Sequence, residues 1–127
     1  MTTIQRITLP QLRAPVSHYC HVTRAGPNVW VSGLTGARSD GSIPDTVVEQ
    51  FDVAMSALDI CLKAAGAGPE HVVKVQVFMT DISERPLINP RRIAYFGPNL
   101  PASTLVEVSG LVDPRMKVEI EAQAYVG

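Results

Sequence analysis

The stretch that decides the fold lies near the C-terminus, where residues 117–126 read KVEIEAQAYV. Apolar and polar side chains alternate along it, which is the pattern of a β-strand with one buried face and one open face. Residues 72–79 read VVKVQVFM and predict a second strand, since they are rich in β-branched residues and also alternate. Both strands therefore belong to a sheet that is apolar on one side.

An amphipathic helix is predicted before these strands, over residues 45–65. Apolar residues recur there at spacings of three and four, at Val47, Phe51, Met55, Leu58, Leu62 and Ala65. The sequence Gly66-Ala67-Gly68-Pro69 ends this helix, because glycine suits the C-terminal cap and proline cannot continue the helix.

A second helix is predicted within residues 85–96, where Pro86 and Pro90 make its start ambiguous. The simplest solution has Asn89 as the N-cap and Pro90 at the first helical position, where a missing N–H does no harm.

Three further strands complete the predicted order. Residues 18–24 and 29–33 flank a Gly-Pro-Asn turn, and residues 105–108 form the third strand. The order ββαβαββ is typical of an α+β protein, with two helices available to cover one face of a single mixed sheet. The whole chain, residues 1–127, is predicted to form one domain.

Composition limits the classes of function. The chain has 11 basic and 12 acidic residues and a formal net charge of −1, which argues against nucleic-acid binding. No apolar run approaches the roughly 20 residues of a membrane span, and the N-terminus lacks a signal-peptide core. Cys20 and Cys61 form no disulfide framework, and the three histidines match no metal-ligand spacing. We expect a soluble, cytoplasmic protein that binds neither membrane nor metal.

Few residues suggest chemistry by pattern alone. Glu119 and Glu121 share one face of the last strand, where they form either a solvated sheet face or a general acid or base in a cleft. Periodicity alone favours the solvated face. Gly33 at a strand end predicts a close approach of its backbone to a ligand or to a neighbouring strand. Cys20 lies between His18 and His21, but a structural cysteine is favoured over a nucleophile because no third group orients a base.

An ordered set of short motifs covers nearly the whole chain. It comprises VSG at 31–33, AAG at 64–66, VVK at 72–74, Asn89 with Tyr95-Phe96, PASTLVEV at 101–108 and VEIEA at 118–122. This set resembles the RidA/YjgF family. The resemblance implies a chorismate-mutase-like fold, a homotrimer with three clefts between subunits, and hydrolysis of reactive enamines and imines to ketones and ammonia without a cofactor. Some members are known only as binding or regulatory proteins.

The resemblance also implies a set of site residues. Glu119 would position and activate water, and the residues lining the cleft would be Tyr19, Ser32, Gly33, Asn89, Ser103 and Thr104. Backbone N–H groups near Ser32 and Gly33 would receive the developing charge.

One position departs from the family. Deaminating members carry an arginine where this chain has Ser103, and that arginine holds a substrate carboxylate as a bidentate fork. Either the substrate has no α-carboxylate, or another arginine such as Arg38 or Arg91 reaches in, or catalysis is lost. We therefore predict a hydrolase for a small enamine, imine or related C=N compound other than a simple 2-iminoacid. The alternative is a non-catalytic trimer that binds a metabolite or regulates a partner.

Overall fold

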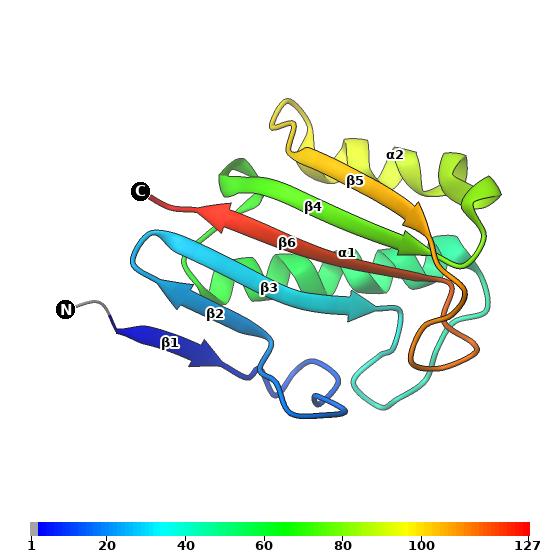
Figure 1. Cartoon of the computed structure of the whole chain (residues 1–127), viewed down its shortest axis with the longest axis horizontal. Helices are drawn as coiled ribbons and strands as arrows, with labels where there is room; N and C mark the ends of the chain where they lie inside the picture. The colour runs from blue at the N-terminus through cyan, green and yellow to red at the C-terminus, as the bar shows by residue number, and fades with distance from the viewer. Residues whose placement is uncertain (1–2) are drawn as a thin grey trace.

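The computed structural model describes residues 3–127, so Met1 and Thr2 of the predicted domain lie outside it. Within residues 3–127, six strands form one sheet in the order β1-β2-β3-β6-β4-β5 (Figure 1). In chain order they are β1 Ile4–Ile7, β2 Val22–Ala25, β3 Asn28–Thr35, β4 Val72–Met79, β5 Ala102–Glu107 and β6 Val118–Tyr125. Helices α1, Val47–Ala64, and α2, Arg85–Phe96, both lie behind one face of this sheet. The predicted fold class is confirmed.

Strand β6 occupies the middle of the sheet because it pairs with β3 on one side and β4 on the other, antiparallel to both. Strands β4 and β5 run parallel to each other. The alternation in β6 has the predicted consequence: Val118 and Ile120 are 0% exposed beneath the helices, and Glu119 points to the opposite face. We call that opposite, helix-free side the open face.

The N-terminal part of the sheet differs from the prediction. Strand β1 adds an element, so the order is βββαβαββ. It was missed because four mostly exposed residues without clear alternation carry no period-2 signal, and pairing with β2 alone defines them. The strand predicted to start at His18 starts at Val22 instead. Residues 16–20 form a loop, which places Tyr19 and Cys20 outside the ladder.

The predicted start of the second helix is wrong. Helix α2 begins at Arg85, directly after a 3-10 turn at Ile82–Glu84, so Asn89 and Pro90 lie inside it. Pro86 occupies the first turn, where its missing N–H has no acceptor to lose, and Pro90 gives up one interior hydrogen bond. Burial of the Ile88 side chain, 0% exposed, stabilises the helix despite this loss.

Helix α1 joins the core to the start of β6. Its apolar stripe, including Phe51, Leu58 and Leu62, is fully buried against the sheet. Gln50 is 0% exposed and holds the loop before β6: its Nε2 donates to the Arg115 carbonyl and its Oε1 accepts from the Lys117 N–H, at 2.9 and 2.8 Å. This buried amide therefore fixes the position of the loop that leads into β6. No helix in residues 3–127 is long and apolar enough to cross a membrane.

Candidate active site

Glu119 lines a hollow of about 510 Å³ at the end of the sheet where β6 begins. Tyr19, Ser32 and Gly33 line the same space, together with Glu121. We call this space the Glu119 hollow. Four of the seven predicted site residues thus come together within one chain: Glu119 from β6, Ser32 and Gly33 from β3, and Tyr19 from the loop before β2.

Gly33 makes room for the Glu119 carboxylate. The pairing of β3 with β6 shifts register between Val31 and Leu34, which is a β-bulge, and Gly33 lies in it. A Cβ atom built on Gly33 would overlap Oε2 of Glu119. The predicted close approach to Gly33 is therefore made by a carboxylate from the neighbouring strand, and only glycine permits it.

The environment of Glu119 makes its ionisation less favourable than that of an exposed glutamate. Partial burial in the hollow raises the pKa of the Glu119 carboxyl above its ordinary value, and the nearby charge of Glu121 raises this pKa further. A raised pKa makes this carboxyl a stronger base when ionised than an ordinary glutamate, which suits a group that exchanges protons with a bound molecule.

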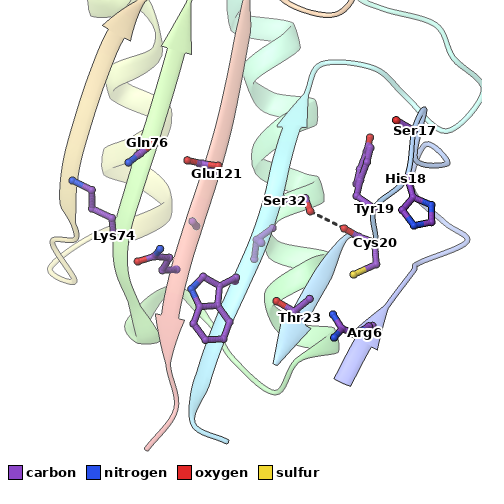
Figure 2. Close-up of a pocket in the computed structure, with 14 residues that line it drawn as sticks. Arg6, Ser17, His18, Tyr19, Cys20, Thr23, Ser32, Lys74, Gln76 and Glu121 are labelled. Carbon is purple, nitrogen blue, oxygen red and sulfur yellow. Dashed lines mark hydrogen bonds between the residues drawn. The ribbon is translucent and has the colours of Figure 1, made fainter. Parts of the chain in front are cut away.

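Hydrogen bonds fix the loop that carries Tyr19. The Ser32 hydroxyl donates to the Cys20 carbonyl at 2.6 Å (Figure 2), and the Ser32 N–H donates to the His21 carbonyl at 3.0 Å. The buried His21 ring accepts from the Leu9 N–H at Nδ1, so its Nε2 donates to the Arg13 carbonyl, both at 2.9 Å. His21 is thus a structural residue, and the Ser32 side chain positions the loop.

A wider hollow of about 750 Å³ extends from there over the open face of the sheet. Figure 2 shows Lys74 and Gln76 on β4 and Glu121 on β6 facing it, with Ser17, His18 and Tyr19 along its rim. Although it is larger, this hollow lacks Glu119, whose pKa is raised by burial. We therefore assign the chemistry to the smaller space. No group of three or more His, Cys, Asp or Glu residues that could hold a metal occurs in residues 3–127.

The other three predicted site residues lie elsewhere in the chain. Ser103 pairs with the buried Val75, so its side chain is on the helix side of β5, where its hydroxyl accepts from Arg92 Nη2 at 2.7 Å. Thr104 is on the open face and accepts from Lys74 Nζ at 2.9 Å. Asn89 lies on α2, one helical turn before Arg92.

The arginines considered from the sequence have other hydrogen-bond partners, although Arg38 lines a neighbouring hollow together with Tyr19 and Gly33. Arg91 bonds Asp52 at 2.9 Å, and Arg38 donates to the Ser42 hydroxyl at 3.2 Å. Arg92, which reaches Ser103, was not considered. The available signal was its spacing of three residues after Asn89, which places both side chains on one side of a helix that starts before Asn89.

This geometry defines a class: a small α+β protein with a glycine-backed carboxyl on the open face of a helix-covered sheet. A family model described as Endoribonuclease L-PSP matches residues 10–126. The chain belongs to this family, which is also called RidA/YjgF.

Relatives agree with this assignment over the full length of the chain. A 2-iminobutanoate/2-iminopropanoate deaminase of Mus musculus is 33% identical over 132 residues, which cover 100% of this chain and 96% of that protein. The crystal structure of Rv2704 from Mycobacterium tuberculosis, described as a YjgF/YER057c/UK114 family member, is 31% identical with a TM-score of 0.83 and covers 98% of this chain and 100% of its own. The crystal structure of the YjgF gene product of E. coli is 26% identical with a TM-score of 0.88 and covers 95% of this chain and 98% of its own.

Proposed function

We propose that this protein hydrolyses a small imine or enamine without a cofactor, with Glu119 as the group that moves protons. The observation that carries the proposal is the Glu119 carboxyl, held against Gly33 in a hollow that raises its pKa. The full-length similarity to a protein named as a 2-iminobutanoate/2-iminopropanoate deaminase supports the same reaction class.

The proposed reaction requires one acid–base group. The imine nitrogen first takes a proton from solvent. Ionised Glu119 then takes a proton from a water molecule as the water oxygen bonds to the C=N carbon and the π electrons of the C=N bond move to the nitrogen. The resulting carbinolamine loses ammonia when Glu119 returns its proton to the departing nitrogen, and the hydroxyl proton is released as the ketone forms. The balance is imine plus water giving ketone plus ammonia. Of the two residues in the β-bulge, Ser32 uses its N–H for the His21 carbonyl, so the backbone N–H assigned to developing charge is that of Gly33.

The positions of Ser103 and Asn89 favour a site completed by a second copy of the chain. Glu119 pairs with Phe78, which pairs with Val106, so Ser103 lies two strands away and three residues back. At about 4.8 Å per strand and about 3.3 Å per residue, that is roughly 10 Å in each direction, and on the opposite face. One small ligand cannot contact both residues in one protomer. A cyclic homotrimer that joins the β5 edge of one copy to the Glu119 hollow of the next would bring Ser103 and Asn89 of one copy to Glu119 of the other.

A role in binding nucleic acid, which the family description Endoribonuclease suggests, fits the site poorly. Glu119 and Glu121 both line the hollow and would repel phosphate groups, and the chain has a formal net charge of −1.

The test is the hydrolysis of imines that an amino-acid oxidase generates. The measurement is the rate at which the imine disappears and ammonia is released, compared with the rate without this protein. We expect Glu119→Gln to lower kcat/KM by about 10²- to 10⁴-fold, the usual contribution of general acid–base catalysis, because the amide keeps the shape but cannot exchange the proton. Glu121→Gln is the matched control on the same strand face and should change kcat/KM much less. Light scattering should give three times the subunit mass for all three proteins. Full activity of Glu119→Gln would refute the proposed role, and binding without turnover by the wild type would favour the non-catalytic alternative.

A further inference from the structure

Arg92 is the charged side chain at the β5 edge that the proposed reaction does not yet use. It projects from α2 toward β5 and donates from Nη2 to the Ser103 hydroxyl oxygen at 2.7 Å. The side chain is half-buried, and this burial lowers the pKa of its guanidinium, although the group stays protonated at neutral pH.

The guanidinium has no counter-charge within the described part of the chain. The ion pairs between residues 3 and 127 that involve arginine are Arg91 with Asp52 and Arg115 with Asp113. A partly desolvated cation bonded only to a neutral hydroxyl is an unfavourable arrangement unless an anion joins it. The position therefore favours binding of a negatively charged group.

The donors around Arg92 suit a carboxylate. The Ser103 oxygen accepts from Arg92, so its own hydrogen remains free to donate outward. The guanidinium has further N–H groups in a planar fork, which matches the two oxygens of a carboxylate. Asn89, one turn earlier on α2, adds an amide that can donate to the same ligand.

We propose that Arg92, aligned by Ser103, binds the carboxylate of the substrate, so that this protein acts on small imino or enamino acids. That the bound carboxylate belongs to a substrate rests on the hydrolysis proposed above, whereas the anion site itself follows from the geometry around Arg92. It reverses the expectation, drawn from Ser103 alone, that the substrate is not a simple 2-iminoacid. The guanidinium that is missing at position 103 on β5 is supplied by Arg92 on α2. Serine at 103 is small enough to leave that space open.

The test separates binding of the carboxylate from turnover. Calorimetric titration uses 2-oxobutanoate, a stable carboxylate of suitable size, and its methyl ester, which lacks the charge. We expect Arg92→Gln to weaken 2-oxobutanoate binding by about 10- to 100-fold, the value of a charge-assisted bidentate contact, and to leave ester binding unchanged. Arg91→Gln on the same helix is the matched control and should change neither. Adding Ser103→Arg to Arg92→Gln should restore part of the acid binding, provided that thermal melts show both variants folded.

Each outcome decides one claim. Three results would overturn the inference. The wild type and Arg92→Gln could bind 2-oxobutanoate equally, the wild type could fail to bind it, or Arg13→Gln could lose binding in place of Arg92→Gln. Arg13 is the informative alternative because it lines the Glu119 hollow itself. If 2-oxobutanoate binds through Arg92 but no imine is hydrolysed, the carboxylate site stands and the hydrolase proposal fails. If imino acids are hydrolysed equally by Arg92→Gln, the hydrolase stands and this inference fails.

Discussion

The Glu119 hollow and the edge formed by β5 and α2 hold opposite charges in similar surroundings. In the hollow, partial burial and a second carboxylate make ionisation of Glu119 less favourable than it is for an exposed glutamate. At the edge, partial burial leaves the Arg92 cation with a hydroxyl as its only side-chain partner among residues 3–127. In the part of the chain that the structure describes, the Glu119 carboxyl lacks a positively charged partner, and the Arg92 guanidinium lacks a negatively charged one. A ligand that supplies the missing charge would stabilise either region.

The two regions also differ in how they are built. The hollow depends on strand register, because the bulge in β3 and a glycine bring a carboxylate from β6 against the backbone. The edge depends on helix packing, because α2 must lie close enough to β5 for one long side chain to reach it. Substitutions should therefore disturb one region without the other.

The largest effect is expected at Gly33. In Gly33→Ala the new methyl group would occupy the space of the Glu119 carboxylate, which must move away. We expect kcat/KM to fall by about 10²- to 10⁴-fold, as it would on losing the acid–base group. Gly110→Ala is the control, since a Cβ there meets nothing within 4 Å among the described residues. If Gly33→Ala is folded and fully active, the contact between Gly33 and Glu119 has no part in function.

The anchor of α2 comes next. Ile88 is 0% exposed, so Ile88→Ala should lower the free energy of unfolding by about 2–5 kcal/mol, measured by urea denaturation. Ile93 on the same helix is 71% exposed, and Ile93→Ala should stay within about 0.5 kcal/mol of the wild type. The same Ile88→Ala protein should bind 2-oxobutanoate more weakly, because Arg92 loses its support. A small change in stability would show that α2 does not depend on this side chain.

The smallest effect concerns stability and pH. Because the folded protein raises the pKa of Glu119, it binds this proton more tightly than the unfolded chain does. The wild type should therefore lose stability as pH rises above the ordinary carboxyl value of 4.5, whereas Glu119→Gln should not lose this contribution. Thermal melts should show Glu119→Gln as the more stable protein at pH 7, with the gap closing below pH 4. A gap that stays constant with pH would mean that Glu119 is not destabilised in the hollow.

Local patterns predicted the regular elements well, and long-range contacts account for the errors. The strand at residues 72–79 and the helix over residues 45–65 follow from side-chain period; both are confirmed, the helix as Val47–Ala64. Strand β1 has no such period and exists because β2 offers it a free edge. The rule that proline breaks a helix misplaced the start of α2, since burial of Ile88 outweighs the lost hydrogen bond.

The sequence by itself determined which face of β6 is buried, and hence that Glu119 and Glu121 share the open side. That result needs only the two-residue repeat of a strand, which is a property of neighbouring residues. Only the tertiary structure decided that the Glu119 carboxylate rests on Gly33 and that Arg92 reaches Ser103. These contacts join residues that are far apart in the chain or on different elements. Their distances depend on sheet order, on a bulge and on the packing of α2, and none of these leaves a periodic signal in the sequence.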